Sequence, residues 1–181
     1  MSDCCASSCC SADHVVRCPR SGTKGFSVEL RTVKAMLTEV ALRQVTVSAY
    51  WFCPDPGCDI VYFAEDGRAC SKADLRVPVW QKEPVGARIV CYCFGENESD
   101  IRSEIEINGR SEAVERVKAH IKAGRCACEV RNPRGTCCLG DMSAAVKRIR
   151  DTFAHVMAIG HAHGRFGTGR NDVSDRGARR P

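Results

Sequence analysis

Apolar and polar residues follow different patterns in the two halves of this chain. Between Arg17 and Glu83 the apolar residues form short runs or alternate with polar ones, as in half-buried strands. This pattern predicts three strands: Val45–Ala49 leading into Tyr50–Phe52, Ile60–Phe63, and Leu75–Val79. Within the same half, Thr32–Arg43 carries apolar residues at helical spacing, which predicts one helix between the strands.

The second half has the periodicity of three amphipathic helices. Capping residues and glycines mark their expected ends: Asn97 or Ser99 and Asn108–Gly109 for the first, Ser111 and Gly124 for the second, and Asp141 or Ser143 at the start of the third. The apolar stripes of these helices are candidate core faces: Ile101 and Ile105; Val114, Val117 and Ile121; and Val146, Ile149, Phe153 and Met157.

These patterns predict an α+β fold in which a β-rich subdomain precedes a helical one. The segment Lys82–Gly86 is expected to be a linker. The two ends of the chain are poor in apolar residues, so we expect them to be disordered. The predicted segments are a cysteine-rich arm (1–16), the β-rich subdomain (17–83), the helical subdomain (88–159) and a basic tail (160–181).

The chain contains 14 cysteines among 181 residues. Its first residues lack the basic and apolar regions of a signal peptide, and no apolar run reaches the roughly 20 residues that span a bilayer. We therefore expect a cytoplasmic protein. In that reducing compartment, so many cysteines indicate metal ligation rather than disulfides.

Charge and motifs narrow the function further. The net charge is +5, and five arginines lie in the tail, where Phe166 is the only aromatic residue. Because the tail has so few aromatic residues for base stacking, we do not predict a nucleic-acid partner. We do not predict binding to a membrane either. The sequence shows no Ser–His–Asp arrangement, glycine-rich phosphate loop or paired-carboxylate motif, so we do not expect an enzyme.

A first candidate metal site lies in the helical half. Cys91 and Cys93 precede its first helix, whereas Cys128 and the pair Cys137–Cys138 flank a later loop. The sequence Asn132–Gly135 within that loop is typical of a turn, which would bring its two cysteine ends together. Four thiolates can hold either a tetrahedral zinc ion or a 2Fe–2S cluster. The Cys-x-Cys spacing differs from the Cys-x₂-Cys knuckles of zinc sites and favours iron–sulfur.

Several stretches resemble the N-terminal domain of CopZ-type copper chaperones, whose helical half is similar to bacterioferritin-associated ferredoxins. They are Arg17-Cys-Pro19, Phe52-Cys-Pro-Asp-Pro-Gly-Cys-Asp-Ile-Val-Tyr-Phe63, Cys91-Tyr-Cys-Phe-Gly95 and Cys128-Glu-Val-Arg-Asn-Pro-Arg-Gly-Thr-Cys-Cys138. The resemblance covers about Arg17 to Arg150. It implies a mononuclear zinc in the β-rich half and a 2Fe–2S cluster in the helical half.

Ligands are carried over residue by residue from this resemblance. The implied cluster ligands are Cys91, Cys93, Cys128 and Cys138, with Cys137 as the alternative to Cys138. The implied zinc ligands are Cys18, Cys53 and Cys58. Ser21 stands where the family's Cys-Pro-x-Cys knuckle has its second cysteine, so the fourth zinc ligand is open: His14, a thiol of the arm, Cys70, or none.

The resemblance implies a cytosolic metal-binding protein that traffics a soft ion, Cu(I) above all. Its partners would be soft metal ions and a copper-transporting ATPase or another metal-resistance protein. These 181 residues carry no Cys-x-x-Cys copper loop, but Cys4, Cys5, Cys9 and Cys10 offer vicinal thiolates that suit soft cations. The alternative is a ferredoxin-like electron carrier or a partner in metal-ion reduction.

Overall fold

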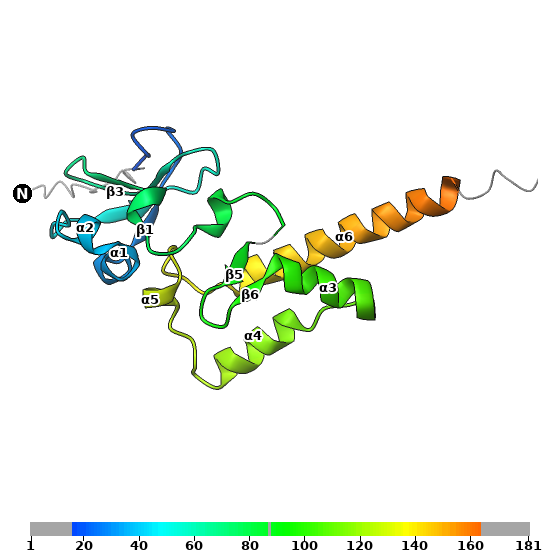
Figure 1. Ribbon diagram of the computed structural model, residues 1–181. Helices are drawn as coiled ribbons and strands as arrows, with labels where there is room; N and C mark the ends of the chain where they lie inside the picture. The colour runs from blue at the N-terminus through cyan, green and yellow to red at the C-terminus, as the bar shows by residue number, and fades with distance from the viewer. Residues whose placement is uncertain (1–15, 87, 164–181) are drawn as a thin grey trace, which may run out of the picture.

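The computed structural model describes residues 16–86 and 88–163, and it has a sheet-containing half and a helical half (Figure 1). The sheet is antiparallel with strand order β1-β2-β3-β4, so each strand pairs with its neighbour in sequence. The strands are β1 (Phe26–Val28), β2 (Tyr50–Phe52), β3 (Ile60–Ala64) and β4 (Ala69–Ser71). Pairing of Phe26 with Phe52 and of Trp51 with Phe63 fixes the register.

Two helices rather than one connect β1 to β2. α1 (Leu30–Met36) ends because Leu37 takes an extended conformation and pairs with Leu75 in an isolated bridge. α2 (Glu39–Leu42) then begins at Thr38, whose hydroxyl accepts a hydrogen bond from the Ala41 backbone at 3.3 Å. The prediction of a single helix over 32–43 was therefore wrong, because a local cap and a long-range bridge compete with its periodicity.

Two of the predicted strands also need correction. Val45–Ala49 is not a strand, and Val47 is 92% exposed, so β2 starts only at Tyr50. Of Leu75–Val79, only Leu75 pairs with another segment, and Pro78 has no backbone N–H to donate. Two short 3₁₀ helices, η1 (Lys72–Asp74) and η2 (Trp80–Lys82), lie on either side of this stretch. The strand at Ile60–Phe63 is confirmed as β3.

The helical half begins with a short hairpin and continues through four helices. The hairpin pairs β5 (Ile89–Cys91) with β6 (Glu96–Asn97). The helices are α3 (Glu98–Asn108), α4 (Ala113–Lys122), α5 (Cys128–Arg131) and α6 (Leu139–His163). Asn97 caps α3 through its side chain, and Gly109 ends it with a φ of 73°, as predicted. α6 starts before Asp141, because the Met142 backbone already donates to the Cys138 carbonyl at 2.8 Å.

Each half has its own apolar core. In the sheet-containing half, Val33 and Leu37 pack against Phe52, Val61 and Tyr62. In the helical half the buried residues come from β5, α3, α4 and α6: Val90, Ile101, Ile105, Ala113, Val117, Met142, Ala145 and Ile149. The predicted stripe of α6 is buried at Ile149, whereas Met157 is 49% exposed. The α+β class is confirmed.

The predictions for the ends of the chain fall mostly outside the described residues. The arm, apart from Val16, and residues 164–181 are not described, whereas α6 extends to His163, beyond the expected limit of residue 159. Among the described helices, none is long and apolar enough to cross a membrane.

Among the hydrogen bonds that connect the two halves, two anchor α5 and the loop that follows it. The Thr32 hydroxyl on α1 donates to the Glu129 carbonyl of α5 at 2.7 Å. The Tyr62 hydroxyl on β3 donates to the Pro133 carbonyl at 2.6 Å. α5, which lies near α1 in Figure 1, therefore rests against the sheet-containing half. The loop between Cys128 and Cys138 thus belongs to both halves.

Candidate metal centres

Three cysteines of the sheet-containing half meet at one point. The sulfur atoms of Cys18, Cys53 and Cys58 all lie within 4.8 Å of one another, and all three residues are buried. The Cys18 and Cys58 sulfurs are 3.8 Å apart. Two sulfurs bound at about 2.3 Å to one tetrahedral ion lie about 3.8 Å apart, whereas a disulfide measures about 2.05 Å. The spacing therefore fits thiolates around one metal ion.

Two tight loops produce this convergence. Cys53 follows β2 and Cys58 precedes β3, and the loop between them turns where Asp55 accepts hydrogen bonds from Gly57 at 2.9 Å and from Cys58 at 3.2 Å. Cys18 lies in a second loop, which closes through its hydrogen bond to the Thr23 carbonyl at 2.9 Å. Apolar side chains cover the three sulfurs: Phe63, with Val16, Trp51 and Ile60 packed against the group.

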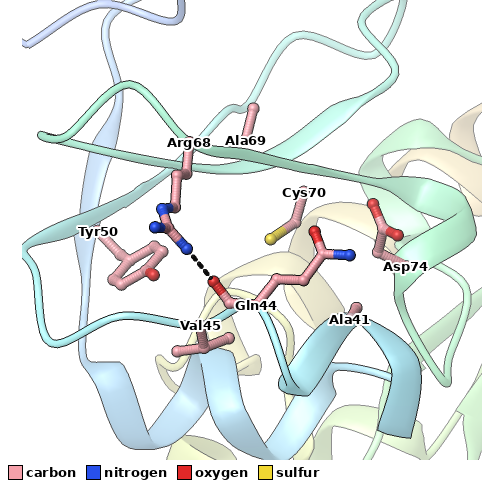
Figure 2. A pocket seen from close by; sticks show the side chains of 8 residues that line it. All are labelled: Ala41, Gln44, Val45, Tyr50, Arg68, Ala69, Cys70 and Asp74. Atoms are coloured by element: carbon pink, nitrogen blue, oxygen red, sulfur yellow. Dashed lines mark hydrogen bonds between the residues drawn. The ribbon is translucent and has the colours of Figure 1, made fainter.

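The structure gives the positions of two residues that bear on the fourth zinc ligand, Ser21 and Cys70. The Ser21 oxygen lies 3.5 Å from the Cys53 sulfur. Cys70 is not among the sulfurs that converge. It lies on β4 and lines a separate cavity of about 240 Å³ together with Tyr50, Arg68 and Asp74 (Figure 2). His14 and the arm thiols lie outside the described residues.

The cysteines of the helical half form two sulfur pairs. The Cys93 and Cys128 sulfurs are 3.8 Å apart. Cys91 and Cys138 are both buried, and each is close enough to the other to shift its pKa. Cys137, the alternative to Cys138, is exposed. Two pairs of sulfurs are what a cluster of two iron ions with four cysteine ligands requires.

The loop between Cys128 and Cys138 is shaped by Asn132, which is 3% exposed. Its side chain donates to the Thr136 carbonyl at 2.7 Å and accepts from the Arg134 backbone at 3.0 Å. Gly135 has a φ of 70°, and a Cβ there would lie 2.9 Å from the Thr32 hydroxyl. The turn predicted from Asn132–Gly135 is therefore present and packs directly against α1.

Comparison with known proteins identifies the family of this chain. Residues 15–76 match the CopZ family model described as a zinc binding domain. The X-ray structure of the Archaeoglobus fulgidus CopZ N-terminal domain matches with 32% identity and a TM-score of 0.59, over 71% of this chain and 96% of that one. The chain belongs to the family of the CopZ N-terminal domain. No curated protein matches the chain.

In this CopZ-type chain the electrostatics of the three-cysteine group favour a bound cation. Burial alone would raise the pKa of the Cys18 thiol, but hydrogen bonds from the Ser21 backbone and hydroxyl and from the Arg20 backbone lower it to about 7. Burial raises the pKa of Cys53, against hydrogen bonding from Ser21. One thiolate forms readily, whereas a buried neighbour keeps its proton unless a positive ion replaces it.

The pKa shifts in the helical half also favour a bound cation. The hydrogen bond from Cys138 lowers the pKa of Cys91 to about 7, and the same contact raises the pKa of Cys138. Burial raises the pKa of Cys128 to about 12. Neighbouring thiols whose pKa values shift in opposite directions cannot all ionise in the absence of positive charge. The donor set therefore fits a cationic cluster core, which would hold all four as thiolates.

Cys126, to which the sequence assigned no ligand role, is half-buried and is a fifth thiol beside the second group. One residue at these sites was missed from the sequence. Lys82 is only 6% exposed and contacts the loop of Cys53 and Cys58. A lysine within a predicted linker gives no sequence signal of burial, so only the structure could identify it.

Proposed function

We propose that this CopZ-family chain is a cytosolic metal-trafficking protein with two resident metal groups and a transported ion. A zinc ion would be held by Cys18, Cys53 and Cys58, and a 2Fe–2S cluster by Cys91, Cys93, Cys128 and Cys138. The observation that carries the proposal is the convergence of three buried sulfurs within 4.8 Å in one half, together with the sulfur pairs of the other.

The zinc would act as a structural element. Its three ligands come from two loops, and the apolar cluster around them is small. For such sites the free energy of metal binding contributes directly to folding. The zinc would thus hold the Cys18 loop against the sheet. The match of residues 15–76 to a zinc binding domain supports this role.

The 2Fe–2S cluster would supply one-electron chemistry when bound. The chain's own contribution is to position the thiolates and donors around it. The Ala127 backbone N–H points at the Cys93 sulfur at 3.4 Å, a contact that favours a thiolate. The Cys91 and Cys138 sulfurs are buried, whereas Cys93 is half-exposed, so one side of the group is nearer to solvent.

The transported ion would be Cu(I), bound by Cys4, Cys5, Cys9 and Cys10 of the arm. Vicinal thiols at low coordination number suit soft monovalent copper. These residues lie outside the described part of the chain, and this step rests on the sequence and on membership of the CopZ family. A copper-transporting ATPase or another metal-resistance protein would then be the partner.

A second function is favoured by the half-exposed Cys93. An electron carrier needs a cluster close to the surface, and it does not need the arm. Deleting residues 1–13 separates the two functions. The trafficking proposal expects the deletion to remove at least one Cu(I) equivalent in a chelator competition, with the cluster spectrum and its reduction unchanged. Equal Cu(I) stoichiometry and affinity in the truncated chain would favour the electron carrier.

A further inference from the structure

Lys82 is a buried cation without an acidic partner in the described part of the chain. Its side chain extends from η2 and is 6% exposed, and no carboxylate among residues 16–86 and 88–163 forms an ion pair with it. The ammonium donates to the backbone carbonyls of Asp55 at 2.7 Å and of Cys58 at 3.0 Å. An ammonium group removed from water is costly unless a negative charge compensates it.

The compensating charge is available at the three-cysteine group. Both carbonyls that Lys82 contacts belong to the loop that carries the Cys53 and Cys58 sulfurs. The positive charge of Lys82 also acts on Cys53, where it opposes the effect of burial on the thiol. Three thiolates around a divalent ion carry one net negative charge. Lys82 makes the whole group neutral.

Ser21 completes this balance because it adds no charge. Its oxygen lies 3.5 Å from the Cys53 sulfur, and the Thr23 backbone lies 3.3 Å from that oxygen. A sulfur at about 2.3 Å and an oxygen at about 2.0 Å from one tetrahedral ion lie about 3.5 Å apart. The distance from the hydroxyl to the Cys53 sulfur therefore fits a fourth ligand of the same ion. A fourth thiolate in its place would leave the group with a net negative charge even beside Lys82.

We propose that Lys82 is the counter-charge of a three-thiolate site at Cys18, Cys53 and Cys58, and that it makes this site prefer divalent zinc to trivalent arsenic. The inference rests on the zinc site of the proposed function and adds what determines its selectivity. Trivalent arsenic with three thiolates is neutral, so its binding would leave the Lys82 charge uncompensated.

The exchange that measures this preference is balanced in atoms and charge. Arsenous acid and three protons convert the zinc tris-thiolate, which carries one negative charge, into a neutral arsenic tris-thiolate, a free Zn²⁺ ion and three water molecules. Three arsenic–sulfur bonds replace three zinc–sulfur bonds, and the three hydroxyl groups of arsenous acid leave as water. No oxidation or reduction occurs, and Ser21 keeps its proton.

The test follows zinc release from the full chain during titration with arsenous acid, read with a zinc-binding dye. The arm cysteines, Cys4, Cys5, Cys9 and Cys10, are replaced by serine so that they do not take up arsenic. In Lys82→Met, the arsenous acid concentration at half-release should fall about tenfold or more, because the zinc site loses its counter-charge and the neutral arsenic site no longer leaves a buried charge uncompensated. The matched control Lys24→Met removes an exposed charge next to the Cys18 loop and should shift this concentration less than about twofold.

A purely structural role for Lys82 would weaken zinc and arsenic binding equally and leave the half-release concentration unchanged, which would overturn the proposal. Lys82→Gln keeps hydrogen-bond donors for the Asp55 and Cys58 carbonyls but not the charge. If Lys82→Met does not fold, Lys82→Gln takes its place in the test and should show the same fall in the half-release concentration. An unchanged half-release concentration in Lys82→Gln likewise overturns the proposal. Lys82→Arg should keep the parent value.

The failure of this inference is distinguishable from failure of the zinc site itself. If Cys53→Ala keeps its full zinc content, the zinc site is wrong and the inference fails with it. If Cys53→Ala loses the zinc while Lys82→Met releases zinc at the parent concentration, the zinc site stands and Lys82 has no part in its selectivity.

Discussion

At the scale of single residues, burial of thiols is the feature that most constrains the chemistry. Cys53 is fully buried and Cys18 is 2% exposed, yet their sulfurs lie close to that of Cys58. Ionising several buried thiols that lie this close together is unfavourable unless a cation compensates their negative charge. A cation at the centre of the group turns this arrangement into a stabilising one.

Replacing one of these sulfurs tests the zinc site. Cys53→Ala should reduce the zinc content by one per chain and lower the free energy of unfolding of the sheet-containing half by about 3 kcal/mol or more, because the binding energy of a structural zinc is folding energy. Visible absorption from the cluster should be largely kept. Metal analysis and thermal unfolding measure both effects.

Cys70→Ala is the matched control. This half-buried cysteine belongs to the same sheet but lies on β4, outside the group of converging sulfurs. It should keep the zinc and lose only the packing of a small side chain, about 1 kcal/mol. An equal loss of zinc in the two variants would show that the metal responds to general destabilisation.

The residue scale is also where the sequence was most informative. The resemblance to CopZ-type chaperones pointed to Cys18, Cys53 and Cys58, and the structure brings these three sulfurs together. Lys82 and the position of Ser21 against Cys53 could not be predicted in this way. Their roles depend on distances between loops that are remote in sequence.

At the scale of elements, local signals predicted what local interactions determine. Asn97 and Gly109 bound α3 because caps act within one turn of the helix. The errors lie where segments remote in sequence interact. Leu37 does not continue its helix because it pairs with Leu75. Among the described residues, that bridge is also the only strand pairing within the predicted strand Leu75–Val79. β4 (Ala69–Ser71) was not predicted because it is short and its residues do not alternate clearly between apolar and polar.

The loop between Cys128 and Cys138 yields a prediction at this scale. Gly135→Ala places a methyl group 2.9 Å from the Thr32 hydroxyl in a left-handed conformation, so it should cost about 1–2 kcal/mol and separate α5 from α1. Because both ends of this loop carry proposed ligands, iron should be lost faster from the variant. Cluster absorption followed during incubation with an iron chelator measures this rate.

Gly124→Ala controls for backbone strain alone. Gly124 ends α4 with a φ of 65°, and a Cβ there meets nothing within 4 Å. It should destabilise the chain by a similar amount with little effect on the rate of iron loss. Equal rates in the two variants would mean that contact with Thr32 does not hold the ligand loop.

At the scale of the whole molecule, the two halves share a ligand loop although each has its own core. The buried Tyr62, in the centre of the sheet, donates to the Pro133 carbonyl beside the second group of cysteines. The sequence predicted two subdomains in the correct order, because their periodicities differ. It could not predict this contact, which joins residues far apart in the chain.

The central claim is that one chain holds one zinc ion and one 2Fe–2S cluster on separate sets of cysteines. Anaerobic purification followed by metal and sulfide analysis tests it most directly, with an electron paramagnetic resonance spectrum recorded after dithionite reduction. The account predicts one zinc, two iron and two sulfide per chain, and a signal from a reduced 2Fe–2S cluster. A colourless protein that contains only zinc would contradict it.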